Sequence, residues 1–172
     1  KAAAQDKQAA ETAAAAGMLL LGRVGRIADV HDWTRNLMRW FPWVPDGAVL
    51  WAESLRSALA RGESQPWGIA DPVEELLATL EELARRGVPF FAETLDFADS
   101  IVRHLRRTQL SGERRERLEV LARWLERALD VTVPAGHFLV VPGLPRPEAA
   151  GGGGGALTVA EILRLLRGGP GG

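Results

Sequence analysis

The residues DPVEELLATLEELARRG, 71–87, constrain the fold more than any other stretch of the chain. Asp71 can accept hydrogen bonds from the first helical amides, Pro72 suits the first helical position, and Glu74 can complete a capping box. Gly87 ends the pattern. Apolar side chains recur every three or four residues, which is typical of a helix with one buried face. The sequence therefore predicts a helix over 71–86 that is buried through Val73, Leu76, Leu77, Leu80, Leu83 and Ala84.

The same helical period recurs on both sides of this segment. It predicts helices from residue 18 to about 28, 33–41, 46–61, from 91 to about 105 and 111–130, with Asp46 and Ser111 as caps of the helices that follow them. The β-branched runs 131–133 and 138–141 indicate either a small hairpin or an extended pair that packs against the bundle. We therefore expect a mainly α fold, an irregular bundle of five or six helices with a small extended or β element near 131–141. The expected apolar positions outside 71–86 are Leu20, Leu21, Val24, Ile27, Ala28, Trp33, Leu37, Trp40, Phe41, Trp51, Leu55, Ala58, Leu59, Leu95, Ala98, Ile101, Val102, Leu105, Leu118, Leu121, Ala122, Leu125 and Leu129.

Changes in composition divide the chain into four parts. Residues 1–17 are rich in Ala and are expected to form a helical or frayed N-terminal segment. Residues 18–145 are expected to form the helical domain. Residues 146–156 contain five consecutive glycines and are predicted to be a flexible linker. Residues 157–172 are predicted to form a tethered amphipathic helix followed by a Gly tail, which docks either on its own domain or on a partner.

Charge and cysteine content exclude several classes of function. The chain has 21 basic and 22 acidic side chains and a net charge of −1, so no nucleic-acid partner is expected. It has no Cys, which excludes disulfides, thiolate zinc sites and Cys nucleophiles and agrees with a cytoplasmic location. The longest apolar run is about half of the ~20 residues that a membrane-spanning helix needs. The composition favours a bacterial origin.

The pentapeptides WAESL, 51–55, and FAETL, 91–95, lie 40 residues apart, as do Asp71 and Ser111. One interpretation is a repeated helix pair, 46–86 and 91–130, with a period near that of HEAT-like repeats. The other is coincidence between amphipathic helices. A paired catalytic role for Glu53 and Glu93 would need the Glu-x-x-His pattern of dimetal bundles, which is absent. We therefore expect both glutamates to be solvated or near helix caps.

Glu74, Glu75, Glu93 and Asp96 are similar in type and rough spacing to a magnesium-binding pattern. In this respect residues 73–98 resemble the all-α nucleotide pyrophosphohydrolases of the MazG type, which carry Glu-Glu-x-x-Glu on one helix and Glu-x-x-Asp on a later one. The resemblance implies a metal-dependent enzyme with these four residues as ligands. Ala78 stands where that family has its third glutamate.

A non-catalytic interaction or scaffold module, acting as part of a larger protein or complex, is the function that the sequence favours. Four of the six tryptophans fall between residues 33 and 51, where a core or an interface would explain them. We expect a protein partner, with no cofactor and no metal. The candidate partner-binding residues are Trp40, Trp43, Ile162, Leu163, Leu165 and Leu166. The pyrophosphohydrolase-like enzyme is the alternative.

Overall fold

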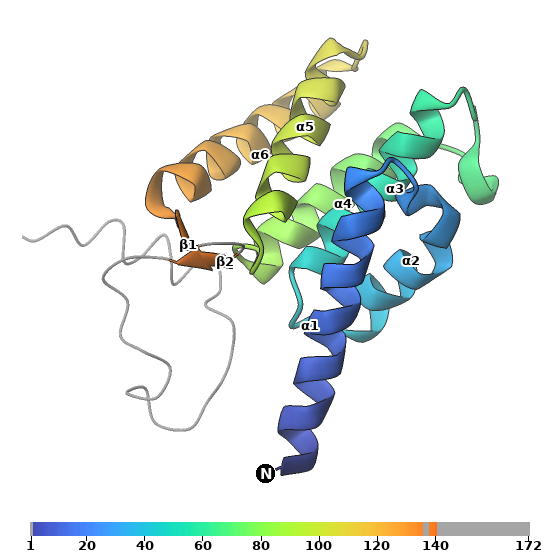
Figure 1. Ribbon diagram of the computed structural model, residues 1–172. Helices are drawn as coiled ribbons and strands as arrows, with labels where there is room; N and C mark the ends of the chain where they lie inside the picture. The colour runs from blue at the N-terminus through green and yellow to red at the C-terminus, as the bar shows by residue number, and fades with distance from the viewer. Residues whose placement is uncertain (1, 136–137, 141–172) are drawn as a thin grey trace, which may run out of the picture.

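A computed structural model describes residues 2–135 and 138–140, and Figure 1 shows how their helices are arranged. The predicted linker, 146–156, and tethered helix, 157–172, lie outside these residues. The described chain is mainly α, as predicted. Its elements are α1 (Ala2–Arg23), the 3₁₀ helix η1 (Ile27–Val30), α2 (His31–Trp40), α3 (Asp46–Ala60), the 3₁₀ helix η2 (Pro66–Gly68), α4 (Pro72–Arg86), α5 (Ala92–Arg107), α6 (Gly112–Val131), β1 (Val133–Ala135) and β2 (Phe138–Val140).

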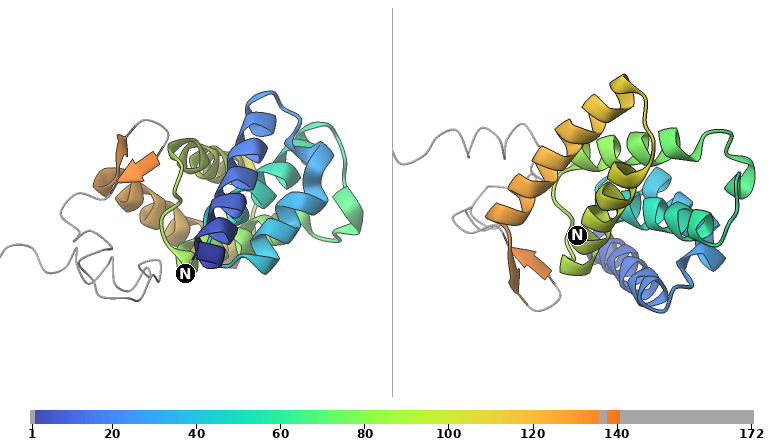
Figure 2. Two further views of the ribbon diagram at one scale, coloured as in Figure 1. Left: turned by 60° about the horizontal axis from the view of Figure 1, so that its bottom comes forward. Right: turned by 90° about the horizontal axis from the view of Figure 1, so that it is seen from above.

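Helix α3 is the centre of the fold. Every residue from 46 to 55 is buried, and α1, α2, α4 and α5 all contact this helix. Figure 2, in the view from above, shows α3 between α1 and α4. A helix that is covered on all sides must find partners inside the protein for each of its polar side chains. Of its three buried polar side chains, Asp46 and Ser54 bind neighbouring elements, whereas Glu53 pairs with Arg56 of α3 itself.

The predicted apolar faces of α4 and α5 pack against α3. In α4 the four predicted leucines are buried, while Val73 and Ala84 are partly buried against the same cluster. All five predicted positions of α5 are buried. Helix α6 buries four of its five predicted positions but leaves Leu129 40% exposed, so that assignment was wrong.

The helix ends test the predicted caps. Asp71 accepts a hydrogen bond from the Glu74 amide at 3.0 Å, as predicted. Glu74 does not return the capping-box bond, because its carboxylate binds two arginines of α6. Ser111 occupies the N-cap position of α6, but its side chain makes no capping hydrogen bond, so its predicted capping role was wrong.

Asp46 caps a different helix from the one expected. It is the first residue of α3, yet its carboxylate accepts hydrogen bonds from the amides of Phe90 and Phe91, at 2.9 and 3.1 Å. The same carboxylate accepts a third hydrogen bond from the Thr94 hydroxyl at 2.8 Å. These donors belong to the start of α5, so one side chain of α3 fixes where α5 begins. Burial raises the pKa of Asp46, and the three donors oppose that rise.

Helix α1 packs through a face that the sequence did not predict. Ala15, Met18 and Leu19 are buried, whereas Leu20 and Val24 are 63% and 67% exposed. The helix ends at Arg23 rather than continuing to residue 28, because Gly25 adopts a left-handed conformation with φ of 71°. Ile27 and Ala28, which the sequence assigned to the same helix, are buried in η1.

The small β element is an antiparallel hairpin in which Val133 pairs with Val140. It lies where the sequence placed an extended element, although Val131 is the last residue of α6 rather than part of a strand. Within the described residues, no helix has the length and apolar character needed to cross a bilayer.

The two matching pentapeptides occupy different positions in their helices. Trp51–Leu55 lies in the middle of α3, whereas Phe91 is the N-cap of α5 and 92–95 is its first turn. Glu53 is buried and forms an ion pair with Arg56 of its own helix, so the expectation that it is solvated was wrong. Glu93 is near a cap, as expected, and binds Arg23 of α1. The structure therefore gives the two glutamates no common role, and it does not support a repeated unit.

Asp46→Ala should lower the free energy of unfolding by about 3 kcal/mol or more, because it leaves the amides of Phe90 and Phe91 and a buried hydroxyl without their acceptor. Denaturation in urea measures this change. Asp29→Ala, which removes an exposed carboxylate, is the control and should change stability by about 0.5 kcal/mol or less. Equal effects of the two substitutions would show that Asp46 does not fix the start of α5.

Candidate functional site

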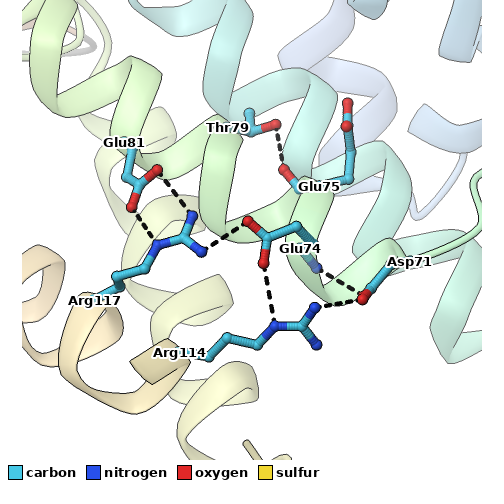
Figure 3. Close-up of polar contacts among 7 residues, drawn as sticks. All are labelled: Asp71, Glu74, Glu75, Thr79, Glu81, Arg114 and Arg117. Atoms are coloured by element: carbon cyan, nitrogen blue, oxygen red, sulfur yellow. Dashed lines mark hydrogen bonds and ion pairs between the residues drawn. The ribbon is translucent and has the colours of Figure 1, made fainter. Parts of the chain in front are cut away.

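The four acids of the pyrophosphohydrolase-like pattern have separate partners. Glu74 binds Arg114 and Arg117 of α6 (Figure 3). The Glu75 carboxylate instead accepts a hydrogen bond from the Trp51 indole at 2.9 Å. Glu93 binds Arg23, and Asp96 is exposed. Among the residues that the structure describes, no three His, Asp or Glu side chains form a group that could hold a metal. The four acids are thus not gathered into a magnesium site.

The acids of α4 instead bind α6. Arg117 donates to both carboxylate oxygens of Glu81, at 2.7 and 3.0 Å, and to Glu74 at 2.8 Å (Figure 3). Arg114 contacts Asp71 and Glu74. The Arg117 guanidinium lowers the pKa of Glu81, while the Glu74 amide and then Arg114 lower that of Asp71. Bidentate Arg–carboxylate geometry fixes the relative position of two helices, so this network has a structural role.

A second charged group lies between α3 and α5. Arg56 donates to both oxygens of the buried Glu53, at 2.6 and 2.7 Å. Burial lowers the pKa of His104 on α5, and the positive charge of Arg56 lowers it further. The pair satisfies a buried charge.

Three tryptophans on or just after α2 stand out from the rest of the aromatic residues. Trp33, Trp40 and Trp43 are 69%, 65% and 46% exposed. Trp33 and Trp40 are seven residues apart, about two helical turns, so they lie on one side of α2. Trp43 follows in the turn before α3 and meets the edge of the Phe41 ring at 5.5 Å. We call Trp33, Trp40 and Trp43 the aromatic surface.

Contacts on its other sides hold α2 in place. Thr34 is buried and its hydroxyl lies 3.0 Å from that of Ser54, which donates to the Leu50 carbonyl. Leu37 is buried beside it. These contacts fix the face of α2 that packs on α3. Trp33 and Trp40 are four residues before and three residues after Leu37, so they lie at the edge of that face, and both are exposed.

Stacked rings fix one flank of α2. The His31 ring stacks on Trp67 of η2, with centroids 4.4 Å apart and planes 6° apart. Trp67 in turn contacts Trp51 at 5.3 Å, and the Arg35 guanidinium lies 5.5 Å above the Trp51 ring. Trp67 has a φ of 54°, a conformation that costs free energy in a residue other than glycine. The stack offsets this cost and anchors the loop between α3 and α4 to α2.

Sequence reasoning identified part of the aromatic surface. It named Trp40 and Trp43 as partner-binding candidates, and both are exposed. It placed Trp33 and Trp40 on one apolar face with Leu37, but only Leu37 is buried. The spacing of Trp33, Leu37 and Trp40 is that of a single helix face, so the sequence held no signal that separates the two exposed tryptophans from the buried leucine. Ile162, Leu163, Leu165 and Leu166 lie outside the described residues.

Comparison with known proteins identifies the family. The family model described as "Y4kD C-terminal domain" matches residues 1–139, most of the chain, and the chain belongs to this family. No curated protein and no solved structure matches it. The description of the family names no activity, substrate or partner.

Arg117→Gln should destabilise the protein at pH 7 by about 1 kcal/mol, a small effect because the pairs are partly exposed. In the native protein the pKa of Glu81 is lowered, so this stabilisation is present above the unfolded-state pKa and is lost as the pH falls through the folded-state value. Urea denaturation at pH 7 and pH 3 should therefore show a difference between variant and wild type only at pH 7. Arg115→Gln, at an exposed position of α6, is the control. An equal difference at both pH values would contradict this role of the network.

Excess MgCl2 should leave the melting temperature unchanged, because the four acids do not form a cation site. Calorimetry with and without the salt, and with choline chloride at equal ionic strength as the control, measures this. A ligand that binds only the folded state raises its melting temperature. A rise specific to magnesium, absent in Glu93→Gln, would restore the pyrophosphohydrolase-like interpretation.

Proposed function

We propose that this member of the Y4kD C-terminal domain family is a non-catalytic helical module that binds a protein partner through its aromatic surface. The observation that carries the proposal is the exposure of Trp33, Trp40 and Trp43 beside a helix that is fixed to the core. Exposed single apolar side chains are common, but three exposed tryptophans within residues 33–43 are not. Tryptophan is the residue that most often dominates the binding energy of protein interfaces.

The rigidity of α2 supports this proposal. A side chain that is already held near its bound position loses little conformational entropy on association. Thr34 and Leu37 fix one face of α2, and the His31–Trp67 stack fixes a flank. The aromatic surface is therefore preorganised, as an anchor should be.

Charges beside the tryptophans suggest how the partner is oriented. Asp32 and Arg39 are exposed next to Trp33 and Trp40, and they give the surface one acidic and one basic edge. Interfaces commonly have an apolar centre and a polar rim of this kind. We infer that the partner presents an apolar patch with charged residues of both signs around it. A cytoplasmic location agrees with the absence of Cys.

The absence of Cys permits a direct search for the partner. Arg39→Cys introduces a single thiol next to Trp40, which a maleimide-linked photocrosslinker can modify. Gln109→Cys, at the exposed turn between α5 and α6, is the control position. A protein that crosslinks from position 39 and not from position 109 can then be purified and its affinity measured.

Trp33→Ala combined with Trp40→Ala should weaken binding of that purified partner by about thirtyfold or more, which corresponds to ~2 kcal/mol. Isothermal titration calorimetry measures the loss. Val120→Ala with Leu129→Ala, which removes two exposed apolar side chains of α6, should leave the affinity unchanged. All four substitutions are at exposed positions and should change the melting temperature little. Equal affinity for the two double variants would refute the proposal.

A further inference from the structure

The loop between α3 and α4 is attached to the bundle by few side chains. We call residues 61–70 the strap. Every residue of the strap except Pro66, Trp67 and Ile69 is exposed. Figure 1 shows the strap at the outer edge of the bundle, between the end of α3 and the start of α4. Three side chains therefore attach the strap to the bundle, and Trp67 is the largest of them.

The Trp67 ring fills a slot whose walls belong to other elements. One wall is the His31 ring of α2, which stacks on Trp67, and the other is the Trp51 ring of α3. Polar contacts hold both walls: Nδ1 of His31 lies 3.3 Å from the Ala28 carbonyl oxygen, and the Trp51 indole donates to Glu75. We call the space between these walls the ring slot. Because α2 and α3 supply its walls, the ring slot remains when the strap moves.

Two features make the closed strap costly. Trp67 has a φ of 54°, in the left-handed region that a residue other than glycine adopts only at a cost in free energy. The Arg35 guanidinium lies 5.5 Å above the Trp51 ring, and its Nε is buried with no hydrogen-bond partner among the residues that the structure describes. A buried donor without an acceptor also costs free energy. An arrangement that relaxes Trp67 and gives Arg35 an acceptor therefore competes with the closed one.

Two glycines of the strap allow it to open. Gly62 and Gly68 have φ values of 90° and 74°, and a Cβ added to either would meet no described atom within 4 Å. Glycine changes its backbone conformation at little steric cost, so these positions can act as hinges. The strap can therefore lift Trp67 out of the ring slot while α3 and α4 stay in place.

We propose that the Trp67 ring is a displaceable occupant of the ring slot, and that an aromatic side chain of the protein partner takes its place when the strap opens. This inference rests on the proposed function, because the partner supplies the new occupant. Trp67 itself shows that a planar aromatic ring fits, and the backbone carbonyl of an incoming residue can serve as the acceptor for Arg35. Helix α2 has 10 residues and is about 15 Å long, so one partner can reach both the ring slot and the aromatic surface.

N-acetyl-tryptophanamide, which carries an indole and backbone-like carbonyls, is the probe that tests displacement in the full chain. The protein is labelled with 5-fluorotryptophan, and its fluorine resonances are assigned by single Trp→Phe substitutions. The probe should move the Trp67 resonance towards that of an exposed indole and give it a solvent shift between H2O and D2O. The Trp33 and Trp40 resonances should not move. N-acetyl-leucinamide at equal concentration is the control and should leave the Trp67 resonance in place.

A matched pair of glycine variants tests the hinge. Gly68 and Gly25 both have a left-handed φ, 74° and 71°, and a Cβ at either would meet no described atom within 4 Å. Alanine at position 68 strains the closed strap and raises the open population, whereas alanine at position 25 strains the turn after α1. The probe concentration that displaces half of Trp67 should therefore be at least threefold lower in Gly68→Ala than in Gly25→Ala.

An empty ring slot should bind the probe more tightly, because no internal competitor remains. The apparent affinity of Trp67→Gly for the probe, followed by the Trp51 resonance, should be at least tenfold higher than that of the wild type. Adding His31→Ala to this variant removes one wall and should abolish the binding. A Trp67 resonance that stays in place in Gly68→Ala at saturating probe, or that responds equally to N-acetyl-leucinamide, would overturn the proposal.

The outcome is separable from that of the proposed function. Trp33→Ala with Trp40→Ala should leave probe binding unchanged, so the ring slot can accept a ring even where the aromatic surface does not bind the partner. The partner obtained by crosslinking should bind Trp67→Gly severalfold more tightly than the wild type. Equal or weaker binding of the partner would show that its aromatic side chain does not enter the ring slot.

Discussion

The burial of α3 on all sides over residues 46–55 is the constraint on which the other elements depend. Buried polar side chains must find partners inside the protein, and two of the three in α3 do so by binding neighbouring elements, while the third pairs within the helix. The Asp46 carboxylate accepts hydrogen bonds from the amides at the start of α5, and the Ser54 hydroxyl lies next to that of Thr34 in α2. The Glu53 carboxylate accepts hydrogen bonds from Arg56. Ala and Gly at several positions of α3 let these neighbours approach: a Cβ on Gly47 would lie 3.0 Å from the Met38 amide nitrogen.

This constraint also explains the exposed tryptophans. Helix α2 is short, and its packing on α3 uses two small contacts, Thr34 and Leu37, while its flank is fixed by the ring stack at His31. The large aromatic side chains of α2 are therefore not needed for its packing. In this account, the fold keeps Trp33 and Trp40 accessible because α3 fixes the orientation of α2.

The fold class and the face of α4 could be predicted from the sequence, because helical periodicity and the Asp71 cap are local signals. The role of Asp46 could not, since its partners at residues 90–94 are distant in sequence and only the folded chain brings them together. Leu20 and Val24 were assigned to a buried face because periodicity marks apolar positions without showing which face meets the core. The local sequence predicted that the Glu74 carboxylate would complete a capping box. It binds Arg114 and Arg117 instead, because tertiary packing brings α6 next to α4.

The aromatic surface could also be predicted only in part from the sequence. Its tryptophans were visible as a cluster, and Trp40 and Trp43 were named, but the sequence did not separate them from Trp51, which is fully buried. That separation depends on how α2 and α3 pack, because tryptophan is used both in cores and at interfaces.

The most direct test of the central claim, that α2 holds its tryptophans outside the core, is fluorine NMR of protein labelled with 5-fluorotryptophan. Each resonance is assigned by single Trp→Phe substitutions, and its shift between H2O and D2O reports solvent contact. The account predicts clear solvent shifts for Trp33, Trp40 and Trp43 in dilute protein, and none for Trp51. Protection of Trp33 and Trp40 to the level of Trp51 would contradict it, because the aromatic surface would then be part of the core.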